Sequence, residues 1–186
     1  MSLTLPFAYL APVSHYSALY HAGEGEMEVC DTYQKQTVRN RCWIDSPNGA
    51  LALTIPVEKP VGHILMQDVR ISDHGNWRHQ HWNALVSSYR QTPFFEYYED
   101  DFAPFYIKKW TFLADFNEEL MRIVCKLIDL DIPVRRTTSY QGSQTISNDF
   151  KPHPYYQVFA SRHHFLPDLS IVDLLFNMGP ESILYL

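Results

Sequence analysis

Glycine is scarce in this chain, and its scarcity excludes the commonest phosphate-binding loops. Only 7 of 186 residues are glycine, which is about 4% where about 7% is usual. The sequence contains neither GxGxxG nor GxxxxGK[ST], and both motifs need glycine so that backbone amides can approach a phosphate. A bound phosphate would therefore have to be held by side chains or by a helix N-terminus.

Cysteine and the common catalytic motifs are also sparse. Cys30, Cys42 and Cys125 are odd in number and form no CxxC pair, which argues against a disulfide framework and a cysteine zinc site and suits a reducing cytosol. Neither HExxH nor GxSxG occurs. The sequence therefore predicts no metal site and no cofactor, and it gives no local support for nucleophilic catalysis.

Excess positive charge and long apolar runs are missing as well. With 15 basic and 21 acidic residues the net charge is −6, so we expect no nucleic acid on a basic surface. No apolar run approaches the ~20 residues that span a bilayer, and the N-terminus lacks the basic region of a signal peptide. These features predict a cytoplasmic protein without membrane insertion. A hydrophobic fraction of 46% predicts a single domain, residues 1–186, with a substantial core.

The first half of the chain is strand-rich. A strand over 3–10, a helix from Ser14 to about residue 22 and a strand over 27–30 form a candidate βαβ unit with parallel pairing. Segments 37–45 and 51–57 flank an Asn-Gly turn, which is a strong hairpin signal. We therefore predict an α/β fold in which a mixed β-sheet is flanked by helices.

The second half is mostly helical. After a possible strand over 64–71, the apolar period changes and predicts a helix over 77–89. Asp115 and Glu118 form a capping box for a helix to about residue 130. Ser170 begins a last helix, and Asp173 is expected to complete its cap. The polar, aperiodic stretch 140–148 is predicted to be a mobile loop.

Three cations stand together in an otherwise acidic chain, at Lys35, Arg39 and Arg41. If 37–45 is a strand, its alternation places Arg39 and Arg41 on one face. Arginine forks suit phosphate or carboxylate, so this cluster predicts a site for a small anionic molecule. The alternative is a solvated strand face whose cations pair with neighbouring acids.

Other polar and aromatic residues are candidates for the same site. Tyr9, Asn40, Trp77 and His81 are predicted to bind substrate around the cations, although Trp77 and His81 could equally belong to the core. His15 directly follows the first strand, where ligand sites are common in parallel sheets, and is the candidate catalytic residue. The alternative for His15 is a surface or capping histidine.

Several blocks of this sequence, in order along the chain, resemble the WbqC-like family. They are residues 9–12 (YLAP), 33–36 (YQKQ) with 39–41 (RNR), 53–57 (LTIPV), 77–89 and 169–179 (LSIVDLLFNMG). Members of that family are often encoded beside surface-polysaccharide genes, such as those for O-antigen. The resemblance implies cytoplasmic modification of a nucleotide-sugar or a lipid-linked sugar.

Two functional hypotheses follow. The first is a transferase-like enzyme of surface-polysaccharide biosynthesis that binds an anionic donor or acceptor, such as a nucleotide-sugar, at the Lys/Arg cluster. The second is a non-catalytic binding or assembly protein of the same pathway, which could act as a homodimer. An enzyme should place a proton-transfer group within one water of the cations, whereas a binding protein needs only the cluster or an exposed aromatic patch.

Overall fold

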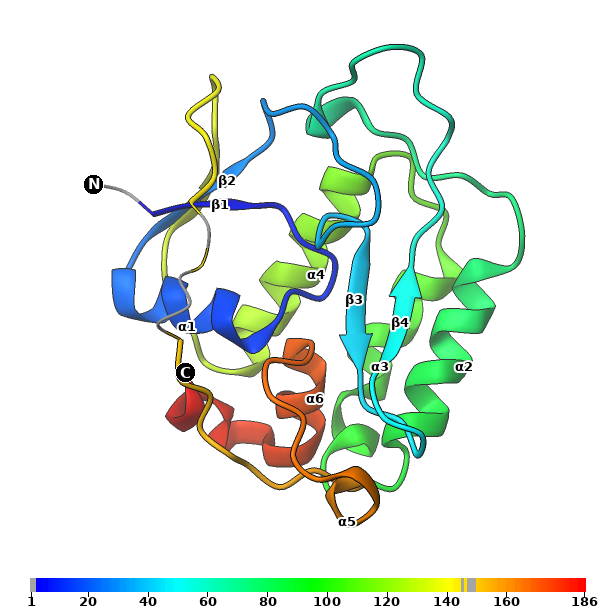
Figure 1. Ribbon diagram of the computed structural model, residues 1–186, viewed down its shortest axis with the longest axis vertical. Helices are drawn as coiled ribbons and strands as arrows, with labels where there is room; N and C mark the ends of the chain where they lie inside the picture. Colours follow the sequence, from blue (N-terminus) through cyan, green and yellow to red (C-terminus); the bar gives the residue numbers. More distant parts are fainter. Residues whose placement is uncertain (1–2, 145, 147–149) are drawn as a thin grey trace.

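The computed structural model describes residues 3–144, 146 and 150–186. A small parallel sheet lies on one side of the molecule and an antiparallel hairpin on the other (Figure 1). The helix α4 (Leu113–Leu127) passes behind and between them. The predicted α/β fold is thus confirmed, with the parallel and antiparallel pairings in two separate sheets.

The parallel sheet confirms the βαβ unit. Its strands are β1 (Leu3–Pro6), β2 (Gly25–Glu28) and β5 (Val134–Arg136), in the order β1-β2-β5. The helix α1 (Val13–Ala22) connects the first two. Gly25 allows this helix to lie close, because a Cβ there would meet Leu19 Cδ2 at 2.4 Å. The first strand ends earlier than residue 10, since Leu10 adopts a φ of 41° and turns the chain.

The hairpin is also confirmed. The strands β3 (Arg41–Ile44) and β4 (Leu51–Thr54) pair antiparallel, with Arg41 opposite Thr54. Both are shorter than predicted. The strand β3 begins only at Arg41, because residues 35–40 form turns and Gln36 has a φ of 57°, and β4 ends at Thr54. Arg39 therefore precedes the strand, and the prediction that Arg39 and Arg41 alternate along one strand is wrong.

Helices surround the two sheets. They are α2 (Trp77–Tyr89), α3 (Phe95–Ile107), α4, α5 (Ala160–His163) and α6 (Ile171–Met178), with 3₁₀ turns η1 (Met66–Asp68) and η2 (Gly179–Tyr185). The helix predicted over 77–89 is confirmed. The strand predicted over 64–71 is instead the turn η1, joined to its neighbours by isolated bridges.

The capping box predicted at Asp115 and Glu118 is wrong, and the cap predicted for α6 is confirmed at Ser170 but wrong at Asp173. The helix α4 begins at Leu113, before Asp115, and Asp115 and Glu118 instead pair with Arg136 on β5. At α6, Ser170 Oγ does accept from Val172 N, but Asp173 is turned into the core. In both places a distant partner competes successfully with the local cap.

The core lies between the sheets and α4. Phe116, Leu120 and Val124 on this helix are at most 1% exposed, and Phe116 packs against the rings of Tyr9 and Trp77. No helix in the described ranges is long and apolar enough to cross a membrane.

Candidate functional site

The loops that follow β2 and β5 meet at one edge of the sheet, and Glu28 fixes them there. In Figure 1 the segment after β5 rises beside the segment after β2. The Glu28 carboxylate is fully buried. It accepts hydrogen bonds from Thr137 Oγ1 at 2.8 Å, Gln141 N at 2.8 Å, Gly142 N at 3.0 Å and Cys30 N at 2.9 Å. Burial alone would raise the pKa of Glu28, but these hydrogen bonds lower it below its usual value.

These contacts also bear on the loop predicted to be mobile over 140–148. Its residues 145, 147 and 148 lie outside the described residues. The described part is anchored by the two amides bound to Glu28 and by Gln144 N, which donates to Thr4 O at 2.7 Å.

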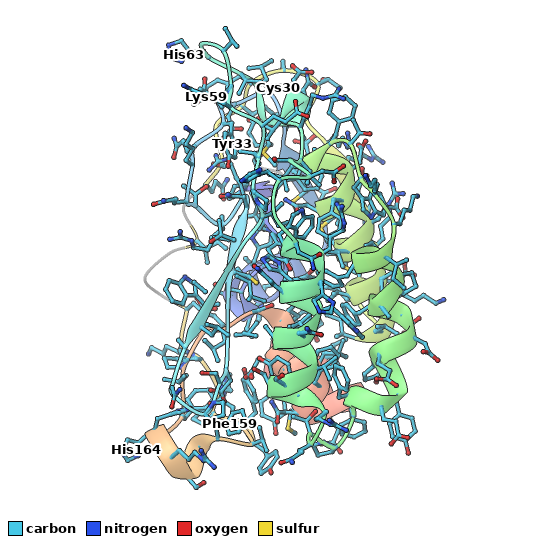
Figure 2. The ribbon with its side chains drawn as sticks, turned by 90° about the vertical axis from the view of Figure 1, so that its right-hand side faces the viewer. Cys30, Tyr33, Lys59, His63, Phe159 and His164 are labelled. Atoms are coloured by element: carbon cyan, nitrogen blue, oxygen red, sulfur yellow. The ribbon has the colours of Figure 1, made fainter. Side chains whose placement is uncertain are left out.

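A polar cavity of about 510 Å³ opens at this edge. Its wall includes Asp31, Thr32, Gln34, Arg39, Tyr140 and Ser143. Cys30 also lines it, and Figure 2 shows Cys30 at the same end of the molecule as Tyr33, Lys59 and His63. The volume is within the range of about 300–1,000 Å³ that small-molecule sites occupy.

Arg39 is the buried cation of this cavity. Its side chain forms an ion pair with Asp31, and the two residues are 6% and 8% exposed. The turn that carries Arg39 is fixed from behind, since Asn117 Nδ2 donates to Arg39 O at 2.8 Å. Asp31 therefore compensates much of the Arg39 charge, which composition and spacing did not indicate.

Buried polar atoms without partners gather around this ion pair. In the described part of the chain, Arg39 Nε, Asp31 Oδ1 and Tyr33 Oη are buried and make no hydrogen bond. Burial raises the pKa of Tyr33 to about 12, while the nearby Arg39 charge acts in the opposite direction. Buried polar groups are nearly always paired, and the described residues include six further side-chain atoms of this kind, so these three orphans do not by themselves mark a binding site.

The other two cations lie outside this wall. Lys35 is exposed in the turn, and Arg41, at the start of β3, donates from Nε to Thr54 Oγ1 at 2.8 Å. Neither residue is among the described residues that line the polar cavity. A role for Lys35 and Arg41 in binding remains a prediction.

His15 lines a second cavity of about 590 Å³, which we call the His15 cavity. This cavity shares Ser143 with the polar cavity. His15 lies in the first turn of α1 and is 2% exposed. Burial lowers the pKa of His15 to about 4, so its imidazole is uncharged at neutral pH.

Asp168 occupies the N-terminus of α1, although it is far away in the sequence. Its carboxyl accepts from Ser14 N and from Ser14 Oγ, both at 2.8 Å. Burial raises the pKa of Asp168, against the effect of these two hydrogen bonds. The predicted cap of this helix by Ser14 is thus replaced by an acid from the last third of the chain.

Tyr9, Trp77 and His81 do come together, but in the core. Tyr9 Oη lies 2.9 Å from His81 Nδ1 and 2.8 Å from Tyr106 Oη, and the rings of Trp77 and His81 meet edge to face. Burial lowers the pKa of His81 to about 4. Among the described residues, the walls of the two cavities do not include these three.

Asn40 is likewise internal. Its Nδ2 donates to Ile55 O at 2.9 Å and its backbone O accepts from Ile55 N at 2.8 Å, which ties the turn to the hairpin. Substrate binding by Tyr9, Asn40, Trp77 and His81 therefore remains a prediction, while their packing gives each of them a structural role.

A buried acid network lies elsewhere, at the hairpin tip. Asp173 is fully buried and accepts from Tyr89 Oη at 2.9 Å, Tyr155 Oη at 2.7 Å and Gln157 Nε2 at 2.8 Å. Burial raises the pKa of Asp173 to about 6, despite these hydrogen bonds. The signal in the sequence was an acid inside the apolar run of α6, since such an acid needs buried partners.

The same network includes Asp45, which is fully buried and lies 2.9 Å from His163 Nε2. The Asp45 charge contributes to the raised pKa of Asp173, and burial raises the pKa of Asp45 itself. Among described residues, no cluster of three or more metal-ligating side chains could hold an ion.

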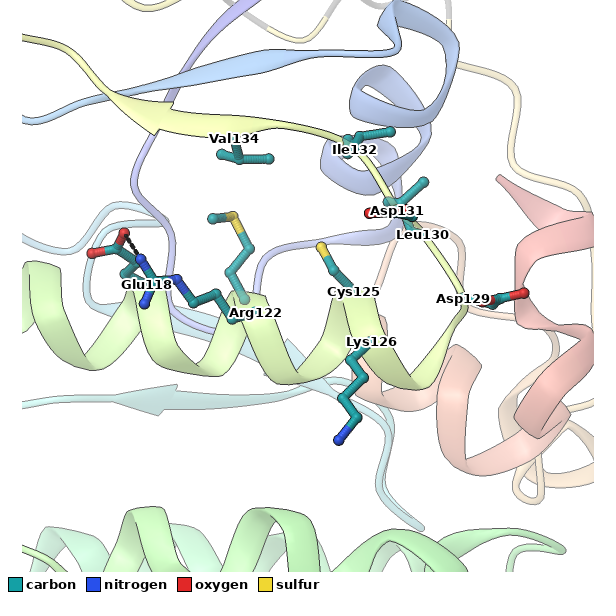
Figure 3. Close-up of a pocket in the computed structure, with 10 residues that line it drawn as sticks. Glu118, Arg122, Cys125, Lys126, Asp129, Leu130, Asp131, Ile132 and Val134 are labelled. Atoms are coloured by element: carbon teal, nitrogen blue, oxygen red, sulfur yellow. Dashed lines mark hydrogen bonds and ion pairs between the residues drawn. The ribbon is translucent and has the colours of Figure 1, made fainter.

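A third hollow, of about 500 Å³, runs between α4 and β5. Figure 3 shows Cys125 directed toward the strand side, whereas Lys126 points away, and Arg122 pairs with Glu118. Burial raises the pKa of Cys125 to about 11, so this thiol is protonated at neutral pH and is a poor nucleophile.

Comparisons with known proteins agree with the resemblance seen in the sequence. Residues 25–150, about two thirds of the chain, match the WbqC-like protein family. The chain is also similar to the uncharacterized protein Rv1507c of Mycobacterium tuberculosis. The two are 24% identical over an alignment 193 residues long, gaps included, which covers 83% of each protein. No solved structure matches it. The matched region contains β2, the Asp31–Arg39 turn, the hairpin and β5, and the chain belongs to the WbqC-like protein family.

Proposed function

We propose that this protein is a transferase-like cytoplasmic enzyme of surface-polysaccharide, O-antigen-type biosynthesis. It binds an anionic donor or acceptor, such as a nucleotide-sugar, at the polar cavity. The observation that carries the proposal is the wall of that cavity, where the buried Arg39–Asp31 ion pair stands among the polar residues Thr32, Gln34 and Ser143.

The chemistry of the wall supports an anionic ligand with several hydroxyls. Arg39 brings a positive charge to this wall, and charge-assisted hydrogen bonds to phosphate or carboxylate are about twice as strong as neutral ones. Asp31 brings a carboxylate to the same wall, which suits a ligand hydroxyl. Thr32, Gln34 and Ser143 add further polar groups to the same wall.

The catalytic part of the proposal rests on His15. Its cavity adjoins the polar cavity at Ser143, so a substrate that fills both would pass close to the imidazole. With a pKa near 4, His15 is a hydrogen-bond acceptor at neutral pH and a weak general base. Its role would be to orient a nucleophilic hydroxyl or amine.

The second candidate is a non-catalytic binding or assembly protein of the same pathway, able to act as a homodimer. One observation favours it: Asp31 already pairs with Arg39, as expected for a structural ion pair. Exposed aromatic side chains such as Tyr97 and Tyr140, 77% and 70% exposed, offer surface for partners.

A thermal-shift screen tests the proposal. The screen adds nucleotide-sugars, acyl-CoAs, aminoacyl donors and S-adenosylmethionine, each at about 1 mM. At roughly 100 times its Kd, a ligand should raise the free energy of unfolding by about 2.7 kcal/mol. We expect a nucleotide-sugar to raise the Tm most. If no compound with a phosphate raises the Tm, the anion-binding proposal is wrong.

Arg39→Lys sharpens this test. Lysine can keep the ion pair with Asp31 but lacks the planar guanidinium fork, so we expect affinity for the selected nucleotide-sugar to fall by about tenfold or more. Arg122→Lys on the exposed side of α4, where Arg122 pairs with Glu118 and Glu119, is the matched control and should bind as the wild type does. If the wild type, Arg39→Lys and Arg122→Lys all bind the nucleotide-sugar equally tightly, Arg39 does not contact this ligand.

A further inference from the structure

The two cavities at the sheet edge are separated by a fixed divider. Val38 lines the His15 cavity and Arg39 lines the polar cavity, so the wall between them is made of consecutive residues. The divider is held to the core, since Tyr9 N donates to Val38 O at 2.9 Å. The two hollows are therefore neighbouring compartments with a rigid partition, and they meet at Ser143.

The compartments differ in chemistry. The described wall of the His15 cavity is dominated by apolar side chains, including Pro6, Pro12, Val38 and Pro167, and includes no lysine or arginine. The helix N-terminus that opens into it, which would otherwise attract an anion, is already occupied by Asp168. A second anion there would meet an acid and no cation.

His15 gives this mostly apolar compartment a buried imidazole, alongside the polar side chains of Ser143 and Gln144. The residue is 2% exposed. A neutral imidazole can donate one hydrogen bond and accept one. It can therefore orient a carbonyl, amide or hydroxyl at the end of an apolar group.

We propose that the His15 cavity is a second binding compartment, which takes an uncharged, mostly apolar group such as a short acyl chain with its carbonyl end at His15. This inference rests on the proposed function, because the apolar group would belong to the second substrate or to a modified part of the first. The polar cavity takes the anion, and the divider at Val38–Arg39 keeps the two chemistries apart.

The test uses two small probes that differ in charge. Hexanamide and hexanoate have the same chain, but only hexanoate is an anion. The ring Hε1 resonance of His15, assigned by comparison with His15→Gln, reports binding by NMR. We expect hexanamide to shift this resonance saturably, and hexanoate at pH 7.5 to bind at least tenfold more weakly, because it would meet Asp168 without a cation.

A filling substitution locates the compartment. Val38 is 38% exposed and lies on the wall of the His15 cavity, so the Val38→Trp protein should fold and its indole should obstruct the cavity. The control is Val61→Trp, because Val61 is 98% exposed and is not among the described residues of either wall. We expect Val38→Trp to weaken hexanamide binding at least tenfold and Val61→Trp to leave it unchanged. Circular dichroism checks that both variants fold.

Three results would overturn the inference: hexanamide leaving the His15 resonance in place, hexanoate binding as tightly as hexanamide, or Val38→Trp binding hexanamide as the wild type does. None of these would affect nucleotide-sugar binding at Arg39. Conversely, if no nucleotide-sugar binds but hexanamide does, the apolar binding site at His15 stands and the anion-binding site at the polar cavity does not.

Discussion

Two fully buried acids, Glu28 and Asp173, lie in different regions and carry opposite pKa shifts. Glu28 accepts four hydrogen bonds at the sheet edge and has a lowered pKa. Asp173 accepts three at the hairpin-tip network, yet burial and the nearby Asp45 charge raise its pKa to about 6. Hydrogen bonds alone therefore do not set the pKa of a buried acid; their balance against desolvation and neighbouring charges decides it.

The comparison also separates perturbed acidity from ligand binding. Figure 2 shows Cys30, from the polar cavity, and His164, next to the His163 of the acid network, at opposite ends of the molecule. Shifted pKa values are common at functional sites, but structural networks shift them too. Here the Arg39–Asp31 pair lines a cavity at one end, whereas at the other Asp173 is satisfied by its own chain. Buried atoms without partners do not separate the two regions, because Asp45 Oδ2 in the acid network lacks one as well.

The largest effect is expected at the ion pair of the cavity end. Arg39→Ala leaves Asp31 buried without its partner, so the free energy of unfolding should fall by about 3–5 kcal/mol. Urea unfolding measures this loss. Asp31→Asn combined with Arg39→Gln removes both charges and should cost clearly less; an equal cost would mean that packing, rather than the uncompensated charge, explains the Arg39→Ala result.

The acid network should respond next. Asp173→Ala leaves the hydroxyls of Tyr89 and Tyr155 and the amide of Gln157 without their acceptor, and we expect a loss of about 2–4 kcal/mol in urea unfolding. Asp173→Asn keeps one acceptor oxygen and should lose less. If Asp173→Ala is as stable as the wild type, the network does not support the fold.

The pH dependence of the two acids should have opposite signs. Because the folded-state pKa of Asp173 is raised to about 6, the folded protein takes up this proton first, and its contribution to stability grows as the pH falls from about 6 to 4, by at most about 1.4 kcal/mol per pH unit. The lowered pKa of Glu28 gives stability that is present above its unfolded pKa and lost as the pH falls through the folded one.

Denaturation of the wild type, Asp173→Asn and Glu28→Gln between pH 3 and 7.5 tests these signs. Relative to the wild type, Asp173→Asn should gain stability as the pH rises from about 4 to 6, and Glu28→Gln should gain it as the pH falls below about 4. Glu28→Gln should cost about 1.5–3 kcal/mol at neutral pH, as for hydrogen bonds to a charged group. If the free energy of unfolding of all three proteins changes with pH in the same way, Asp173 and Glu28 do not carry the opposite pKa shifts described above.

Much of the fold is predictable from local sequence patterns. The βαβ unit, the hairpin around Asn48-Gly49 and the helix over 77–89 follow from short-range periodicity and turn residues, and the structure contains all three. The positive φ of Gln36 is a local exception, because a non-glycine residue rarely adopts it. This turn ended the predicted strand and removed the alternation argument for Arg39.

The candidate site was less predictable because its contacts are distant in sequence. Lys35, Arg39 and Arg41 are conspicuous as cations, but only the fold shows that Asp31 compensates Arg39. Asp168 reaches Ser14 across 154 residues, and no local pattern indicates that pair. Tyr9 and His81 illustrate the reverse case, in which polar groups satisfy each other in the core.

The most direct test of the central claim is a map of where a nucleotide-sugar binds. Backbone amide shifts of ¹⁵N-labelled protein are followed during titration with UDP-glucose, or with the nucleotide-sugar that raises the Tm most. The account predicts the largest saturable shifts at Thr32, Gln34, Gly142 and Ser143, around the polar cavity. Shifts confined to the hairpin tip and α5, at the opposite end of the molecule, would contradict it.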